Sequence, residues 1–398
     1  MLIALTGKPS VGKSTFFKAA TLAEVEIAPH PFTTIKATEG IAFVKIKCVD
    51  EDFNLQCKPK FGYCINNYRF IPIRLMDVPG LIEGSHKGLG LGNQFLNDLS
   101  QADALIEIID ISGSTNAKGE AVEPGSYDPR NDILMLENEI DMWLLNLLKK
   151  DWSRFIRQVK QENKNFVKEI AEKFSGLKIT EGLVKEALKE LKLNEDPTKW
   201  NENELKLFAL TLRKKSKPLI IACNKIDIKG AEENYNKLKK EFKDYILMPC
   251  SAESELALRE AAKHNLISYI PGENNFKILK ENALNEKQKN ALNFIKKNVL
   301  EKYNSTGVQE VLDKTIFELL NYFTVYPVEN ENKLTDSQNN ILPDVHLLPE
   351  NSTTLDLAFK IHTDIGNKFT AAIDIKTKRR LGKDQILKNK DVIKILTK

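Results

Sequence analysis

Short, largely apolar runs alternate with segments of helical spacing in the first third of the chain. Residues 2–5, 73–76 and 104–109 form such runs, which are typical of buried strands in a parallel sheet. The second and third runs each lead into an aspartate, Asp77 and Asp110. The alternation predicts an α/β fold with a mostly parallel sheet.

The pattern changes near residue 129 to a stretch rich in lysine, glutamate and leucine. Phe166, Ile170 and Phe174 recur at every fourth position, as on one face of a helix. We predict a helical insertion over residues 129–216. We interpret its aromatic residues as its own core.

Strand-like runs resume at residues 217–224 and 247–251, and a second helical segment follows them. From about Tyr322 the chain becomes β-rich. Its 398 residues exceed what one hydrophobic core usually supports. We therefore predict an α/β domain in two parts, residues 1–128 and 217–321, interrupted by the helical insertion, and a small β-rich domain over residues 322–398.

The composition is that of an ordinary soluble protein, with 42% hydrophobic and 29% charged residues. No run is long enough to span a bilayer and the N-terminus has no basic leader, so we expect a cytoplasmic location and no membrane partner. The five cysteines lack C-x-x-C spacing. We therefore expect reduced structural thiols, and neither a disulfide framework nor a zinc site.

Residues 7–14 have the spacing G-x-x-x-x-G-K-[ST] between a predicted strand and a predicted helix. Glycines at both ends let backbone N–H groups wrap around an anion, where Lys13 would reach the β- and γ-phosphates and Ser14 would bind Mg²⁺. The alternative is a plain glycine-rich turn. The predicted phosphate-binding residues are Gly7, Lys8, Pro9, Ser10, Val11, Gly12, Lys13, Ser14 and Thr15.

Two further motifs follow predicted strands. In D-x-x-G at residues 77–80, Asp77 can hold the metal through water and the Gly80 N–H can approach a γ-phosphate. In N-K-x-D at residues 224–227, Asp227 can accept hydrogen bonds from guanine that adenine cannot donate.

The guanine-binding set is completed by a short segment after the next strand. Its residues would contact the guanine oxygen through the backbone. The predicted base-binding residues are Asn224, Lys225, Asp227, Ser251, Ala252 and Glu253. The order of the four motifs, each after a strand, indicates a GTP- or GDP-binding protein.

Several segments resemble one group of GTPases more closely. Residues 30–34, 77–84 and 88–92 resemble the switch regions of the Obg-related GTPases, which include Obg, Drg and YchF. Residues 358–366, 376–382 and 391–393 resemble a TGS domain, and together with the helical insertion they are most similar to the archaeal YchF-related branch. The resemblance implies a P-loop NTPase fold with a Ras-like sheet and a C-terminal, ubiquitin-like TGS domain.

The resemblance also implies roles for single residues. Thr34 would coordinate Mg²⁺ in the GTP state, or Thr33 would do so if the alignment shifts by one position. Residues 84–92 would form a switch II segment that becomes ordered when GTP binds. The implied catalytic residues are Lys13, Thr34 and Gly80, and the implied metal ligands are Ser14, Thr34 and Asp77.

Three departures from related GTPases qualify the expected chemistry. Leu81 stands where Ras-like proteins have the glutamine that orients water, so turnover should be slow; His86 is a candidate substitute or a solvated loop residue. Ser10 stands where many relatives have a K⁺-associated asparagine, which leaves K⁺ dependence open. Asp227 is retained in the base-reading motif, where YchF proteins that prefer ATP depart from N-K-x-D. Its presence favours GTP as the nucleotide.

The last segment of the chain is basic. Residues 368–398 hold ten Lys or Arg against three Asp, densest at residues 376–380. This is either a solvated turn or a face for RNA phosphates, and the TGS resemblance implies RNA of the ribosome; DNA is not expected. We therefore predict a slow, Mg²⁺-dependent GTPase switch linked to ribosome or RNA. The alternatives are a nucleotide-gated binding module with negligible hydrolysis and an ATPase in the same fold.

Overall fold

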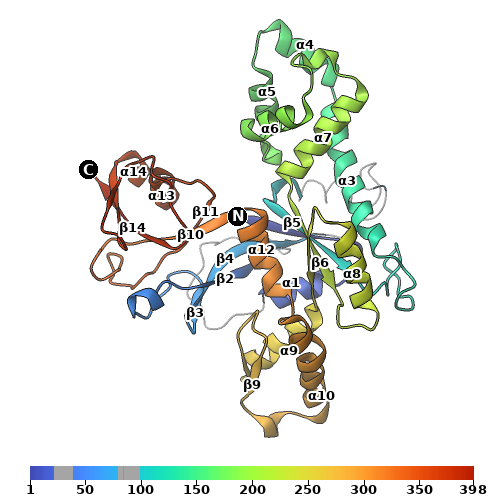
Figure 1. Ribbon diagram of the computed structural model, residues 1–398, viewed down its shortest axis with the longest axis vertical. Coiled ribbons are helices and arrows are strands. Elements are labelled where there is room, and N and C mark those ends of the chain that lie inside the picture. Colours follow the sequence, from blue (N-terminus) through green and yellow to red (C-terminus); the bar gives the residue numbers. More distant parts are fainter. Residues whose placement is uncertain (22–38, 79–83, 85–98) are drawn as a thin grey trace.

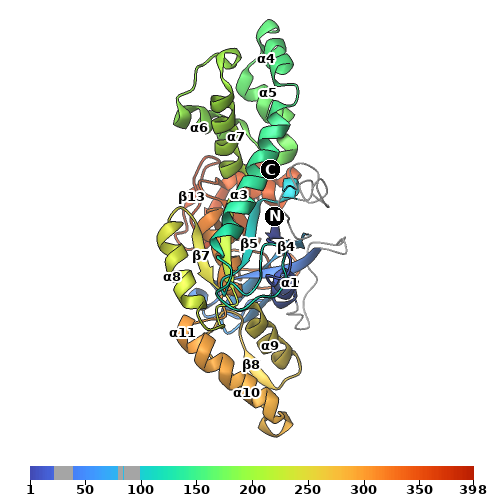
Figure 2. The ribbon, with the colours of Figure 1, turned by 90° about the vertical axis from the view of Figure 1, so that its right-hand side faces the viewer.

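The computed structural model describes residues 1–21, 39–78, 84 and 99–398. A central sheet lies between three peripheral groups of elements (Figure 1): helices α4–α7 at the top, strands β10–β14 at the left, and α9 and α10 at the bottom. The view turned by 90° shows the same elongated arrangement with the helical group at one end (Figure 2).

The central sheet has seven strands in the described residues, in the order β2-β4-β1-β5-β6-β7, with β3 paired to the outer part of β4. β1, β4, β5, β6 and β7 run parallel, while β2 and β3 are antiparallel to β4. The strands are β1 (Leu2–Thr6), β2 (Glu39–Lys47), β3 (Tyr63–Ile65), β4 (Tyr68–Asp77), β5 (Ala104–Asp110), β6 (Leu219–Asn224) and β7 (Ile246–Pro249). The predicted α/β fold is confirmed, and every predicted strand of this sheet is present.

Helices cover both faces of this sheet, which explains why its parallel strands are almost continuously apolar. On one face, α1 (Lys13–Thr21), α9 (Ala252–Lys263) and α12 (Val308–Lys314) enclose a core with Ile3, Leu5 and Ile106. On the other face, α3 (Arg130–Lys149) packs on Leu2 and Ala4. α8 (Ala231–Glu241) covers β6 on that side.

Residues 130–216 form a helical lobe. Its helices are α3, α4 (Trp152–Gln161), α5 (Phe166–Lys173), α6 (Glu181–Leu191) and α7 (Glu202–Ser216). Ile170, Phe174 and Phe208 lie in its core, and the Trp152 and Trp200 rings stack with centroids 5.8 Å apart. The aromatic residues therefore do form the core of the lobe itself, as the spacing predicted. The four-region division of the chain by residue number stays a prediction.

The segment after α9 starts in the lower part of Figure 1 and returns to the central sheet with α12. It consists of the hairpin β8 (Ile267–Tyr269) and β9 (Phe276–Ile278), then α10 (Glu286–Ile295), a π-helical turn (Lys296–Leu300), α11 (Glu301–Tyr303), α12 and a second π-helical turn (Thr315–Leu319). Short 3₁₀ turns elsewhere are Glu51–Phe53, Ser175–Leu177, Pro197–Lys199 and Glu281–Ala283.

The C-terminal part is a separate five-stranded sheet in the order β11-β10-β14-β12-β13. It contains β10 (Tyr322–Pro327), β11 (His346–Pro349), α13 (Thr354–Ile361), α14 (Thr363–Asn367), β12 (Phe369–Asp374), β13 (Arg380–Leu381) and β14 (Asp391–Thr397). The predicted β-rich start at Tyr322 coincides with β10. The loop between β10 and β11 contacts the segment between β2 and β4, where the Lys58 N–H donates to the Ile341 carbonyl at 2.8 Å.

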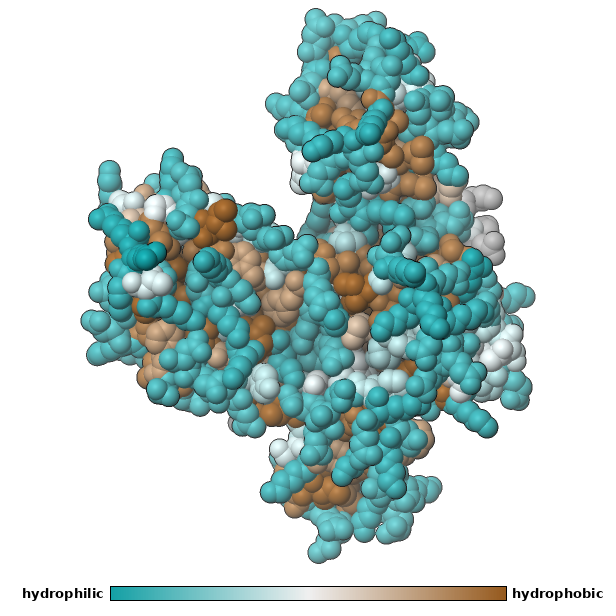
Figure 3. Space-filling view, in the orientation of Figure 1, coloured by the Kyte–Doolittle hydropathy of each residue, from teal (hydrophilic) through white to brown (hydrophobic). Residues whose placement is uncertain are grey.

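The face shown in Figure 3 is mostly hydrophilic, with hydrophobic residues gathered in patches on the lobes and near their junctions. Within the described ranges, every helix is too short or too polar to serve as a membrane span.

Candidate nucleotide-binding site

The loop between β1 and α1 has a backbone that only glycine accommodates at two positions. Gly7 and Gly12 have φ values of 134° and 100°. A Cβ atom on Gly7 would lie 2.3 Å from the Ile108 carbonyl oxygen, and one on Gly12 would lie 2.2 Å from Asn224 Nδ2. The loop therefore packs tightly against β5 and β6, and it leads directly into the N-terminus of α1, where backbone N–H groups favour an anion.

Lys13 is the first residue of α1 and is 8% exposed. Its Nζ donates to the Lys8 carbonyl at 2.8 Å. Burial lowers the pKa of Lys13 to about 8, although the nearby Asp77 acts in the opposite direction. A buried ammonium at a helix N-terminus, bonded to a neutral carbonyl, is suited to an anionic ligand that would favour its charged form.

Ser14 and Asp77, two of the three predicted metal ligands, lie together. The Ser14 Oγ donates to Asp77 Oδ2 at 2.9 Å, because α1 starts beside the end of β4. Asp77 Oδ1 is buried and has no hydrogen-bond partner in the part of the chain that the structure describes. A hydroxyl and a carboxylate with a free oxygen fit Mg²⁺, which prefers oxygen ligands and retains several waters.

Thr33, Thr34, Gly80, Leu81 and His86 lie outside the described residues. Of the predicted switch II segment, Gly84 is described, and its N–H donates to Glu139 Oε1 on α3 at 2.8 Å.

Asn224 joins the phosphate loop to the second base-binding segment. Its Nδ2 donates to the Val11 carbonyl at 2.8 Å, and its Oδ1 accepts from the Ala252 N–H at 3.0 Å. Ser251 precedes α9 as its N-terminal cap, since its side chain accepts from the Ser254 N–H. The three motifs predicted from separate parts of the chain therefore meet at the carboxyl ends of β1, β6 and β7.

Asp227 and Lys225 differ in their surroundings. Asp227 is half-buried, and its carboxylate accepts no hydrogen bond from the described residues. Lys225 has a positive φ of 63°, and its Nζ pairs with Asp110 Oδ2 at 2.8 Å. The carboxylate that would select the base is thus available, while the lysine stem is held in place by an ion pair.

Asp110 is a site residue that the sequence reasoning noticed as a strand end but gave no role. It is fully buried at the end of β5 and accepts from the hydroxyls of Ser114 and Thr115 at 2.8 and 3.0 Å. Burial alone would raise the pKa of Asp110, but hydrogen bonds from Lys225, Ser112 and Ser114 lower it on balance. The carboxylate is therefore charged and fixes Lys225.

Lys8, a predicted phosphate-loop residue, turns its side chain away from the loop. Its Nζ donates to the Thr115 carbonyl at 2.8 Å, pairs with Asp132 Oδ2 at 2.9 Å and lies 3.7 Å from the centre of the Tyr127 ring. Only its backbone can therefore contribute to a phosphate site. The buried side chain anchors the loop to the segment between β5 and α3.

Three features together define a P-loop nucleotide site of the GTPase class. They are a glycine-rich loop before a helix, a serine and an aspartate beside the helix start, and a base-selecting motif at the neighbouring strand ends. Sequence profiles agree with this class: that of the 50S ribosome-binding GTPases matches residues 2–150, that of the G4 motif-containing domain of the Obg-like GTPase YGR210-like group matches residues 222–330, and that of the TGS domain matches residues 338–397.

Relatives that match most or all of the chain define the class of GTPase more closely. An uncharacterized GTP-binding protein of Methanocaldococcus jannaschii is 48% identical over 396 residues, covering 100% of this chain and 99% of the relative. The crystal structure of a GTP binding protein from Pyrococcus horikoshii matches with a TM-score of 0.82 and 37% identity, covering 100% of both chains. The ribosome-binding ATPase YchF of Bacillus subtilis is 27% identical over 314 residues, 77% of this chain and 78% of that protein.

The chain belongs to the Obg-like family of P-loop GTPases, in its archaeal YchF-related branch, and carries a C-terminal TGS domain. The resemblance that the motifs indicated is therefore confirmed.

Proposed function

We propose that this protein binds GTP together with Mg²⁺, hydrolyses it slowly to GDP and phosphate, and acts as a molecular switch. The observation that carries the proposal is the bridge of Asn224 between Val11 and Ala252, which holds the loop of residues 7–14 beside the start of α9 and so supports a single nucleotide site. Asp227 lies three residues further on with its carboxylate available, which supports guanine as the base.

The roles of the phosphate-binding residues follow from their positions. The backbone N–H groups of residues 7–14 would surround the phosphates, and Lys13 would exchange its bond to the Lys8 carbonyl for one to a β- or γ-phosphate oxygen. Ser14 and Asp77 would hold Mg²⁺, with Thr34 as a further ligand in the GTP state. When bound, the ion neutralises negative charge on the transferred phosphoryl group.

Hydrolysis requires attack of water on the γ-phosphorus, and no side-chain nucleophile is needed. Gly80 would contact the γ-phosphate through its N–H. Leu81 cannot hydrogen-bond to water, so turnover by the protein alone should be slow. Ser10, with its positive φ of 63°, is exposed at the loop and can offer an oxygen to K⁺, which the choice of salt in the assay tests.

The proposed partner is the ribosome or its RNA, contacted through the TGS domain. In the turn before β13, Lys376 pairs with Asp52 at 2.8 Å. Lys378, Arg379 and Arg380 are exposed and form no ion pair with other described residues, which leaves their charges available for phosphates. This partner accords with the cytoplasmic location that the sequence predicts.

The test is GTP turnover by the purified protein in KCl and in NaCl, with and without ribosomes from its own source. Lys13→Ala serves as the blank. Stimulation by ribosomes supports the switch. Tight GTP binding without stimulated turnover would instead indicate the nucleotide-gated binding module, and ATP outcompeting GTP would indicate an ATPase, the activity named for the Bacillus relative.

The contact surface can be tested in the same assay. Arg379→Ala with Arg380→Ala should reduce ribosome binding in a co-sedimentation experiment. Arg154→Ala with Arg157→Ala is the matched control, since these two exposed arginines lie on α4 in the helical lobe. Equal losses in both double variants would argue for unspecific charge attraction and against a TGS contact.

A further inference from the structure

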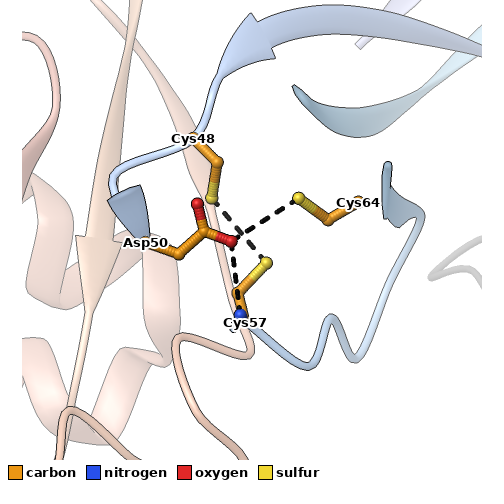
Figure 4. A group of neighbouring side chains, drawn as sticks. All are labelled: Cys48, Asp50, Cys57 and Cys64. Atoms are coloured by element: carbon orange, nitrogen blue, oxygen red, sulfur yellow. Dashed lines mark hydrogen bonds between the residues drawn. The ribbon is translucent and has the colours of Figure 1, made fainter. Parts of the chain in front are cut away.

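Four side chains converge in the part of the chain between β2 and β4 (Figure 4). Cys48 directly follows β2, Asp50 and Cys57 lie in the connecting segment, and Cys64 lies on β3. Their three sulfur atoms and one carboxylate oxygen all lie within 4.8 Å of one another. The cysteine spacing predicted reduced structural thiols and no zinc site, but the fold brings three of the five cysteines into one group with an aspartate.

The separations inside this group fit a single tetrahedral ion. Cys48 Sγ lies 3.7 Å from Cys57 Sγ, and Cys64 Sγ lies 3.7 Å from Asp50 Oδ2. A tetrahedral zinc ion with its usual bond lengths holds two sulfur ligands about 3.8 Å apart and a sulfur and an oxygen about 3.5 Å apart. A disulfide would need sulfur atoms at about 2.05 Å, and all five cysteines are free.

We propose that Cys48, Asp50, Cys57 and Cys64 form a structural Zn²⁺ site. Three thiolates and a carboxylate fill the four positions of a tetrahedral ion, which leaves none open for a substrate and is the mark of a structural rather than a catalytic site. Cys48, Asp50 and Cys57 are buried and Cys64 is half-buried, so the ion would be shielded from water.

The carboxylate of Asp50 is held by neighbours as a metal ligand needs to be. Its Oδ1 accepts from Asn67 Nδ2 at 3.2 Å, and its Oδ2 accepts from the Cys57 N–H at 3.3 Å. Asn67 sits in the tight turn between β3 and β4 with a positive φ of 62°. Such outer hydrogen bonds fix the direction of ligand oxygens before the ion binds.

A buried cation balances part of the charge. Four anionic ligands around Zn²⁺ leave two negative charges. Arg69, 1% exposed, is the residue opposite Cys64 in the β3–β4 ladder, where paired side chains share one face. Its guanidinium donates to the Leu342 and Pro343 carbonyls at 3.1 and 2.6 Å, while Nε has no partner among the described residues.

The site lies where the central domain meets the C-terminal sheet. Cys48 and Cys57 share a core cluster with Tyr326, Leu342 and Val392 of the C-terminal part. The segment between the ligands also donates backbone hydrogen bonds to that part, from residue 58 to 341 and from residue 60 to 343. Zn²⁺ would therefore fix the segment on which the TGS domain is docked.

The test is the zinc content of the full-length protein, expressed with added zinc and purified without metal-affinity steps or chelators. We expect one zinc ion per chain by elemental analysis, and its loss in Cys57→Ala. Cys250→Ala is the matched control, because it also removes one buried thiol but lies outside the group, and it should keep the ion.

Two measurements on the wild-type chain keep the proposal falsifiable if Cys57→Ala does not fold. Exchange of zinc for Co²⁺ should give the intense visible absorption of a tetrahedral thiolate site. After chelation and denaturation, five thiols should react with a thiol reagent. Four results would each overturn the proposal. They are a chain without metal, a Co²⁺ sample without this absorption, iron in place of zinc, and only three reactive thiols, which would reveal a disulfide.

Discussion

Strand β4 has a candidate site near each end, and the two sites are built in opposite ways. Asp77 at its carboxyl end belongs to the proposed nucleotide site, while Arg69 near its start lies opposite Cys64 in the cysteine group. The proposed nucleotide site would bind phosphates through backbone N–H groups, so its residues must follow one another at fixed spacing. The cysteine group relies on side chains carried by a hairpin and a loop, so its spacing has no fixed pattern.

The difference between the two sites shows when a site can be recognised from the sequence. Where the backbone itself binds, as in the loop from Gly7 to Ser14, the chain must take one path and the spacing reports it. Where only side-chain tips meet, many loop paths bring them together. The two sites should also be independent, because additivity holds for separate positions without shared partners.

The largest expected effect tests that independence by crossed variants. Lys13→Ala should lower GDP affinity at least about 100-fold, because a charged hydrogen-bond donor in a buried site is lost, and should leave the zinc content unchanged. Cys57→Ala should remove the zinc ion and leave GDP affinity unchanged. Calorimetric GDP titration and elemental analysis of both variants measure this, and a comparable loss of GDP affinity in Cys57→Ala would show that the sites are coupled.

A smaller effect concerns the choice of base. Asp227→Asn should weaken GTP binding about 10- to 100-fold, since an amide cannot accept both guanine hydrogen bonds, while binding of xanthosine triphosphate should improve. Competition against a fluorescent nucleotide measures both affinities, with Asp244→Asn as a control outside the motif. Unchanged GTP affinity would remove Asp227 from the site.

The ion pair of Asp110 and Lys225 provides a test of stability within the nucleotide site. Asp110→Asn should lower the free energy of unfolding by about 2 kcal/mol, because a buried carboxylate that accepts several hydrogen bonds is replaced and Lys225 loses its partner. Urea denaturation measures the change. Glu241→Gln, which removes the surface partner of Arg130, should change stability by less than about 1 kcal/mol.

The smallest effect is a pH dependence of nucleotide binding. The pKa of Lys13 is lowered to about 8 in the free protein, and bound phosphates favour its charged form. Binding near pH 8 should therefore take up about half a proton, and affinity should fall as the pH rises further. Titration calorimetry in two buffers of different ionisation enthalpy detects the uptake. Equal enthalpies in both buffers would contradict it.

Much of the fold could be predicted because parallel strands buried on both faces are continuously apolar. The edge strands β2 and β3 escaped prediction, since they pair antiparallel to β4 and their partners are set by long-range contact. The phosphate-loop backbone was predictable from its glycines. The side-chain direction of Lys8 was not, because it depends on Asp132 and Tyr127, which lie far along the chain. The sequence shows that Asp110 ends a predicted strand. A single aspartate at a strand end is too common to indicate a role in a site.

Helix α3 has a geometric consequence for the whole molecule. Its first half packs on the central sheet through Leu136 and Ile140, and its second half lies in the core of the helical lobe through Leu144 and Leu148. The helix is unbroken over 20 residues, which makes it about 30 Å long. It can therefore act as a rigid rod whose base is held by the Lys8 anchor at Asp132 and whose middle, at Glu139, contacts the Gly84 N–H. A tilt of about 10° at the base would carry the far end through about 5 Å, so small movements near the nucleotide are magnified in the lobe.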